Sequence, residues 1–580
     1  MPHVHAAHHL KYGQVKTGGF IPTEAEFDEE DLAACGPRGI RAADLRREIL
    51  EAEARRIHAN RRYLFRKPRA SQYFRGTTLV RSNEERSSLR LELFFDLVFV
   101  GIVSVLAEEV IGLPTGASLI RYIIAYILAW FIWSLYRELN DCYWTGDIYQ
   151  SVLTLFTMAM LVVFGNNATN IQEQLSDGPA RATTIGAYLL AEFSIYGTQL
   201  FYSMHIKPYR AQIRAHVSTW PIAVALYIGS IFASVRPAIA MVVVGLVVEY
   251  GGWAFFYSPT FKRIMKLRYS SAVAIEHEVE RMTDFCTLVL GETVYSIVSN
   301  HPAGEGVTDA TGRAILALCI AFCFLMFYTL RSGSKSVLHP LRRSVVTAQA
   351  WFFLHIPLVS ALTLFGDACG DFTKEQLVES AVRWILCTTY AIAMLCVWLL
   401  AMIEGDNDAR GDVWVPKLWR LLPRLLVGVI AVFLPLSYYH IEEAGSSEPV
   451  GGEPAVTGER EHALRRLYEG EIGAEGHQAK VFAALSTTTI LGILAAFSMA
   501  TLLWEWISAL DGPNTPADEA PEHMREGDAH TPSHALRTPA WRGFPTLFEP
   551  GFSHFDRGHQ REQTHADSKL PAVTPGEDEA

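Results

Sequence analysis

Four side chains that can take up or release a proton stand near the middle of long apolar runs. They are Glu192, Glu249, Glu292 and His355. A charged group at that depth in a membrane is costly, so it normally has a buried partner or lines a path for water or ions. Three carboxyl groups and an imidazole at similar depth can exchange protons or hold a cation. We therefore expect these four side chains to line a wet cavity.

Other polar residues continue the faces on which these groups lie. Tyr196 and Gln199 follow Glu192 at helical spacing, and Arg281 and Ser296 share a helical face with Glu292. The same residues also permit a purely structural interpretation. In that interpretation, hydrogen bonds across helices and arginine partners satisfy the four groups and hold the helices together.

Asp96 lies near the start of another apolar run, Leu91–Leu106. It is a candidate gate or helix anchor on an ion path. The alternative is a local role, in which Asp96 interacts with the helix dipole or pairs with Arg86 or Arg90 at the membrane surface.

The elements that must position these residues are predicted to be membrane helices. Half of the 580 residues are hydrophobic and 19% are charged, which is typical of a polytopic membrane protein. We expect an all-α transmembrane bundle of about twelve spans. The predicted spans are 93–113, 119–136, 148–165, 183–203, 218–235, 237–257, 282–299, 312–330, 345–366, 380–402, 417–439 and 481–508. The fifth and sixth could instead form a tight hairpin that does not fully cross.

Charge and composition divide the chain further. Residues 1–90 form a basic N-terminal tail, 91–403 a transmembrane core, 404–510 further transmembrane helices with an acidic outer loop at 440–480, and 511–580 a tail predicted to be disordered. Lys and Arg concentrate in alternate loops, which places both termini in the cytoplasm and the expected loops 166–182 and 367–379 outside. The net charge of −11 averages over basic and acidic segments, and their uneven distribution indicates membrane topology and no nucleic-acid partner.

Four segments carry a family resemblance. They are ELFFDLVFV (92–100), the aromatic-rich 131–150, HEVERMTDFCTLVLGETVYSIV (277–298) and 339–359 with its His-x-Pro. As a set they resemble the bacterial low-temperature-requirement A (LtrA) membrane proteins, and we take the chain to be a eukaryotic, fungal-like member. The resemblance implies a polytopic membrane core and no defined chemistry.

Two of these segments also resemble each other. An offset of 190 residues lays 93–101 on 283–291 and brings Phe95 onto Phe285 and Gly101 onto Gly291. A duplication of six plus six helices with parallel halves would follow. The arrangement is loosely similar to endolysosomal potassium channels built from six-helix repeats.

The leading functional hypothesis is transport or conduction of a small solute or cation through the bilayer. Its path would involve Asp96, Glu192, Glu249, Glu292 and His355. An intramembrane enzyme acting on lipid is one alternative, and a scaffold or sensor that acts through its tails is another. His277-Glu278 lacks the second histidine of a zinc-binding HExxH motif, so neither a metal nor a cofactor is expected. A homodimer is possible.

Overall fold

The computed structural model describes residues 63–68, 72–75, 78–81, 90–143, 145–206, 210–299, 301–334, 337–406, 408, 413–440 and 482–510. All of them belong to one compact unit of the chain. Most of the N-terminal tail, the acidic loop at 440–480 and the tail 511–580 lie outside the described residues, and so do the predictions made for these segments.

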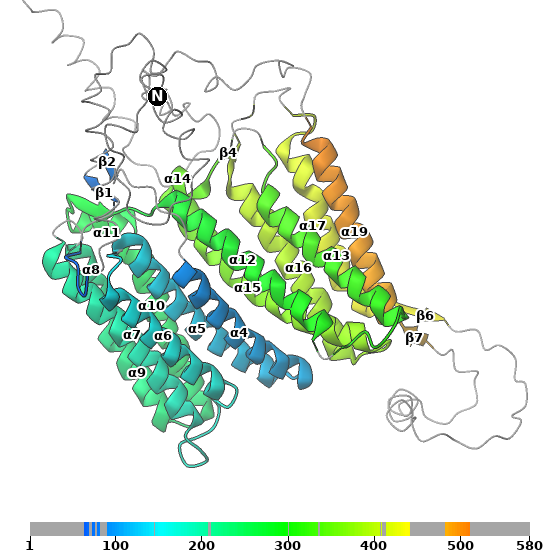
Figure 1. The fold of residues 1–580 in the computed structure, drawn as a ribbon, viewed down its shortest axis with the longest axis horizontal. Helices are drawn as coiled ribbons and strands as arrows, with labels where there is room; N and C mark the ends of the chain where they lie inside the picture. Colours follow the sequence, from blue (N-terminus) through cyan, green and yellow to red (C-terminus); the bar gives the residue numbers. More distant parts are fainter. Residues whose placement is uncertain are drawn as a thin grey trace, which may run out of the picture. The chain divides into compact units, whose positions relative to one another are not determined.

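The described part of the chain is built almost entirely from helices, as the apolar runs predict (Figure 1). The helices that precede residue 257 form a first half. They are α4 (Arg90–Gly112), α5 (Gly116–Tyr143), α6 (Ile148–Ala168), α7 (Ala180–His205), α8 (Arg210–Val217), α9 (Trp220–Phe232) and α10 (Val235–Phe256).

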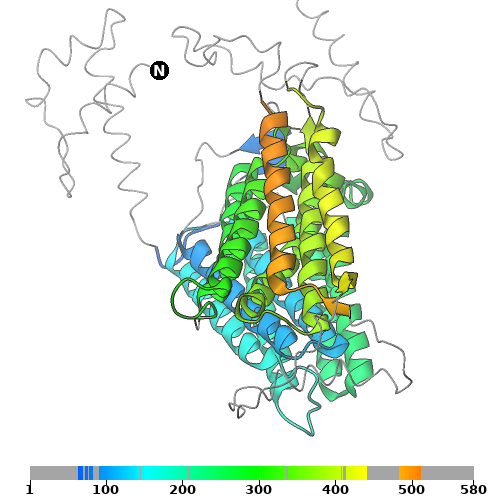
Figure 2. The same cartoon turned by 90° about the vertical axis from the view of Figure 1, so that its right-hand side faces the viewer.

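A second half follows after the short helix α11 (Pro259–Ile264). Its helices are α12 (Ile275–Val298), α13 (Asp309–Leu330), α14 (Pro340–Arg343), α15 (Val345–Lys374), α16 (Ser380–Ile403), α17 (Lys417–Phe433) and α19 (Thr487–Ser508), with a 3-10 turn at Leu434–Leu436. Figure 2 shows α19, in orange, beside the yellow α17 with which it packs.

Short strands join the ends of these helices. β1 (Gln72–Arg75) pairs antiparallel with β2 (Thr78–Arg81) and with β3 (Tyr269–Ser271). Two further antiparallel pairs are β4 (Val337–Leu338) with β5 (Gly405–Asp406), and β6 (Tyr438–His440) with β7 (Phe482–Ala484). These pairs fasten segments that precede or follow the long helices.

Nine helical segments among the described residues are long and apolar enough to cross a membrane. One of them joins α8 to α9, because α9 alone has 13 residues and is too short to span a bilayer. The remaining predicted spans, 93–113, 183–203 and 282–299, correspond to α4, α7 and α12. These helices are as long as the others. α4 and α12 carry more charged residues, whereas α7 is rich in uncharged polar residues, and the charged side chains of all three include candidate site residues.

Local sequence explains where several helices begin and end. Thr308 and Ser344 cap the starts of α13 and α15 through reciprocal hydrogen bonds with Thr311 and Thr347. Only Ala233 and Ser234 separate α9 from α10, so the two helices pack as a tight hairpin, and each belongs to a segment long enough to cross a membrane. The expected outer loop at 367–379 begins later than predicted, because α15 continues to Lys374.

The packing of the first half recurs in the second. Apart from the short α8, each closely packed helix pair among α4, α5, α6, α7, α9 and α10 has a counterpart among α12, α13, α15, α16, α17 and α19, taken in that order. A glycine marks the crossing of the first and third helix in both halves. A Cβ on Gly165 would lie 2.8 Å from Ile102, and one on Gly366 would lie 2.7 Å from Thr293. This repetition is what a six-plus-six duplication predicts.

Candidate functional site

The two halves meet where α4 packs against α12, an interface that we call the seam. Along the seam, residue numbers increase in the same direction on both helices: Glu92 contacts His277, Asp96 contacts Arg281, and Ser104 contacts Glu292. The two helices are therefore parallel, as the predicted arrangement of the halves requires. The seam carries three successive layers of side chains.

The first layer is a buried network of charges, which we call the charged layer. Its residues are Glu92 and Asp96 from α4, Arg137 and Asp141 from α5, and His277, Glu278 and Arg281 from α12, all at most 6% exposed. Arg281 Nη2 lies 3.1 Å from Asp96 Oδ1, which also accepts a hydrogen bond of 2.7 Å from the Trp133 indole. Arg137 pairs with Glu278.

His277 lies between two acids of this layer. Its Nε2 is 3.0 Å from Glu92 Oε2 and its Nδ1 is 3.2 Å from Asp141 Oδ1. A neutral imidazole has one donor and one acceptor nitrogen, whereas a carboxylate only accepts. Both contacts are hydrogen bonds only if the imidazole is doubly protonated or one of the acids carries a proton. The His277 bridge therefore holds one proton beyond those of a neutral imidazole and two carboxylates.

The second layer, which we call the aromatic layer, consists of Phe99, Trp130, Trp133 and Phe285. The rings of Trp133 and Phe285 stack with centroids 4.5 Å apart, and Phe99 packs 5.6 Å from Phe285. Aromatic rings at these distances pack tightly and bury large areas. This layer separates the charged layer from the polar groups farther along the seam.

The third layer is acidic and lies toward the C-terminal ends of α4 and α12. The Ser104 hydroxyl donates to Glu292 Oε1 across the seam. Asp367 on α15 interacts electrostatically with both Glu292 and Glu108. Glu292 is only partly buried. Ser296, one turn beyond Glu292, donates to the Glu292 carbonyl and lies against Gly370 of α15.

Glu192 and Glu249 lie elsewhere, inside the first half. The two carboxyl groups are direct neighbours and are 0% and 3% exposed. The hydroxyls of Tyr188 and Tyr227 donate to Glu249 Oε2 at 2.8 and 2.6 Å, and the Trp220 indole donates to Glu192 Oε2 at 3.1 Å. Among the described residues, no ion pair reaches either carboxyl group.

The residues predicted to support Glu192 have different environments. The Tyr196 ring packs against Trp220 and His216, with centroids 5.8 and 5.6 Å apart. Gln199 is buried, and its Nε2 has no hydrogen-bond partner among the described residues. Tyr196 therefore belongs to the layer around the two acids.

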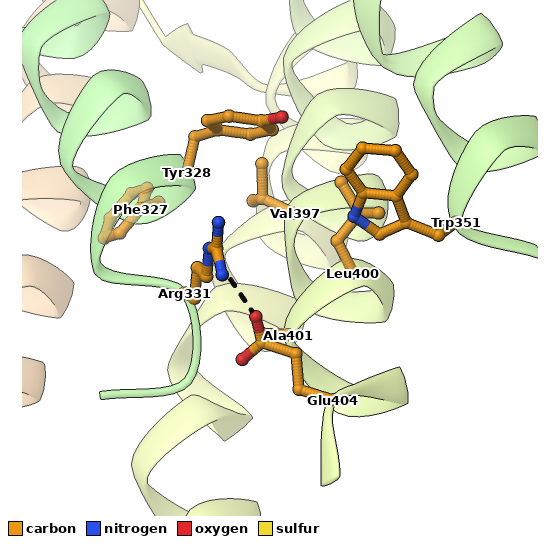
Figure 3. A pocket seen from close by; sticks show the side chains of 8 residues that line it. All are labelled: Phe327, Tyr328, Arg331, Trp351, Val397, Leu400, Ala401 and Glu404. Carbon is orange, nitrogen blue, oxygen red and sulfur yellow. Dashed lines mark ion pairs between the residues drawn. The ribbon is translucent and has the colours of Figure 1, made fainter. Parts of the chain in front are cut away.

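The second half contains a small cavity between α13, α15 and α16 (Figure 3). His355 contacts two of the residues that line it, Tyr328 and Trp351. Its Nε2 is 2.9 Å from the Tyr328 hydroxyl, and its ring packs on Trp351. Both of these residues line the cavity, together with Phe327, Arg331, Val397, Leu400, Ala401 and Glu404. His355 itself is completely buried behind them.

Two charged groups lie at the cavity, at the end of the bundle where α13 finishes. Arg331 and Glu404 form an ion pair, with Nε 3.8 Å from Oε1 (Figure 3). Burial raises the pKa of the Glu404 carboxyl, which lies just beyond α16. Nearby, burial and the charges of Arg331 and Arg342 lower the pKa of His339 to about 4.

The structure thus brings Glu192 and Glu249 together and gives Glu292 and His355 other partners. Asp96 pairs with Arg281 across the seam, whereas Arg86, one of the two arginines considered as a local partner, lies outside the described residues. The prediction that Arg281 and Glu292 share a face is consistent with the seam, because both contact α4.

Sequence reasoning missed much of the charged layer. Glu92, Arg137, Asp141, His277 and Glu278 were not candidates. A signal for them was present, since α4, α5 and α12 each carry two of the layer's ionisable residues four positions apart: Glu92/Asp96, Arg137/Asp141 and His277/Arg281. Three such pairs on different predicted spans indicate a shared polar layer.

The comparison with known families concerns the same helices. The model of the bacterial low temperature requirement A protein family matches residues 88–444, which is more than half of the chain. The chain belongs to the LtrA family. The match begins just before α4 and continues past α17, beyond the expected core at 91–403. No curated protein and no solved structure matches this LtrA protein.

Proposed function

We propose that this LtrA protein transports or conducts a small cation along the seam between α4 and α12. The observation that carries the proposal is the order of the layers within one helix pair. The charged layer and the acidic layer lie on either side of closely packed aromatic rings. Such an order suits a path with polar ends and a closed middle, because ions need polar partners while a tight apolar constriction excludes water.

The charge of the seam favours a cation. The charged layer holds four carboxyl groups, Glu92, Asp96, Asp141 and Glu278, against two guanidinium groups, Arg137 and Arg281, and the one extra proton of the His277 bridge, so negative charge remains in excess. Beyond the aromatic layer, Glu292 neighbours further acids. Rings of acidic side chains attract cations in membrane pores.

The predicted site residues take different roles in this proposal. Glu292 contacts the cation, and Ser296 continues its face. Asp96, held by Arg281 and Trp133, acts as a gate or anchor between the charged and aromatic layers. His355 positions Tyr328 at the cavity in the second half.

The proposal is tested by flux measurements on purified protein in liposomes. A pH-sensitive dye is trapped inside, and potassium, sodium and proton gradients are imposed in turn. The wild type is compared with Glu292→Gln and with Glu280→Gln, the same change at an exposed position of α12. We expect a cation-dependent signal in the wild type and in Glu280→Gln that is lost in Glu292→Gln.

A folded wild type that moves none of these ions would overturn the proposal. A lipid product formed by the same preparation would then favour the intramembrane enzyme. If the biological role disappears only when residues 1–80 or 511–580 are deleted, the scaffold or sensor is favoured.

A further inference from the structure

The first half contains a buried pair of acids that forms no ion pair with a basic side chain among the described residues. Glu192 and Glu249 are neighbours on α7 and α10, and their hydrogen bonds come from uncharged phenol and indole groups. Two carboxylates in a low-dielectric interior repel each other strongly, so at least one normally keeps its proton. A buried charge that no opposite charge balances is costly in any protein interior.

Unsatisfied polar atoms in the same layer point to an occupant. Oε1 of Glu192 and Oε1 of Glu249 have no hydrogen-bond partner among the described residues. His216 on α8 is 1% exposed, and neither of its ring nitrogens has a partner there. Its ring packs on Tyr196, which also contacts the Trp220 indole bound to Glu192. Buried groups in this state normally accompany a proton, an ion or a water molecule.

We infer that Glu192 and Glu249 form a proton-binding site beside the buried layer of Tyr196 and His216. The proton resides on the Oε1 atoms that are otherwise without partners, and Tyr188, Tyr227 and Trp220 fix the opposite oxygens. The titratable groups that interact with Glu249 are Glu192, Tyr188 and Tyr196 from α7, Tyr227 from α9 and Tyr250 from α10 itself, and Tyr196 also interacts with Glu138 of α5. His216 of α8 packs on Tyr196. The site is separate from the seam and does not depend on cation movement there.

The second half supplies a matched control. Glu505 on α19 is buried as well, but Arg424 of α17 donates to both of its oxygens at 2.6 and 2.7 Å. A carboxyl group held in this way is ionised, because a two-pronged guanidinium partner stabilises the charge. Glu505→Gln therefore removes a buried carboxylate but no carboxyl proton.

The experiment is infrared spectroscopy of the full-length protein in lipid nanodiscs. A protonated carboxyl group gives a C=O band that ionised carboxylates lack. At neutral pH we expect this band in the wild type and in Glu505→Gln. In the double variant Glu192→Gln, Glu249→Gln, the part of the band due to the pair is lost. In the wild type alone, the same part disappears reversibly as the pH is raised, which tests the site without a variant.

An unchanged band in the folded double variant overturns the inference. So does a wild-type band that is indifferent to alkaline pH. A carboxylate signal that instead responds to sodium or potassium at constant pH also overturns it, because the occupant is then a metal cation. Since the readout requires no flux, it can succeed or fail independently of the seam.

Discussion

Each half of the molecule holds a buried carboxyl group on its last helix, and the two halves satisfy that group in opposite ways. In each half the last helix, α10 or α19, packs on the fifth, α9 or α17. In the first half, Tyr227 of α9 donates a hydroxyl to Glu249 of α10. In the second half, Arg424 of α17 donates two N–H groups to Glu505 of α19.

The difference teaches what a basic partner does to a buried acid. The guanidinium of Arg424 stabilises the charge of Glu505, and the resulting ion pair, which we call the tie, joins α17 to α19. The hydroxyl donors are compatible with both the protonated and the ionised form of Glu249, because a phenol can donate to a carboxylate and to a neutral acid alike. The packing of the two halves corresponds, so a change in a few side chains separates a structural site from one that can titrate.

Breaking the tie in the second half should have the largest effect. Arg424→Met leaves the Glu505 charge buried without its partner, and it also removes hydrogen bonds to the carbonyls of Val397 and Arg331. We expect a loss of about 3–5 kcal/mol in the free energy of unfolding. Denaturant unfolding in detergent micelles measures it. A loss no larger than that of Glu249→Gln would refute the contrast between the halves.

The glycine crossings give the next largest effect, and it should differ between the halves. A Cβ on Gly366 meets backbone atoms of Thr293 at 3.1 Å, which cannot move aside easily. A Cβ on Gly165 meets only the side chain of Ile102. We therefore expect Gly366→Ala to cost about 1–3 kcal/mol and Gly165→Ala clearly less. Thermal unfolding of the two variants side by side decides this, and equal losses would contradict it.

His339 gives the second half a separate pH dependence at the end of the bundle. Its pKa is about 4 in the folded protein, whereas an unperturbed imidazole titrates near pH 6.5. Below about pH 6.5 the unfolded chain takes up a proton that the folded protein refuses, so stability falls as the pH drops toward 4. Allowing for partial solvent screening, the loss is on the order of 1 kcal/mol.

This pH dependence is checked by unfolding at several pH values. We expect His339→Asn to flatten the stability profile between pH 6.5 and 4 while leaving the neutral-pH value nearly unchanged. A wild-type profile that is already flat in this range would show that His339 does not contribute in this way.

The smallest effect on stability should come from the acid pair. In Glu249→Gln the amide oxygen still accepts from Tyr188 and Tyr227, so we expect a change below about 1 kcal/mol at neutral pH. The same unfolding assay measures it, with Arg424→Met as the reference for a large loss. A destabilisation as large as that of Arg424→Met would mean that Glu249 serves as a structural tie.

The sequence predicts the helices well, because in lipid a helix satisfies the backbone N–H and C=O groups of an apolar run within the run itself. The parallel halves were also predictable, from the offset that aligns Phe95 with Phe285. The pairing of Glu192 with Glu249 was not. Depth in the membrane can be read from each apolar run, but the direction in which a side chain points depends on how α7 rotates against α10.

The charged layer shows a second limit. Asp96 was recognised as costly, yet its partner was sought among nearby arginines. Arg281, 185 residues away in the chain, reaches it because α4 and α12 lie side by side. Sequence proximity is a poor guide to ion pairs when a duplication brings the starts of two halves together.

The Arg424–Glu505 contact has a consequence for the order of synthesis. The family match ends at residue 444, but α19 begins at Thr487 and is the last helix of the second half. Because all helices of the first half precede α17 in the chain, the first half can assemble while the ribosome is still translating. Arg424 of α17, in contrast, has no Glu505 carboxylate to bind until α19 has been synthesised. The second half is therefore completed only after α19 has been synthesised, and a chain that stops after α17 should be a substrate for membrane quality control.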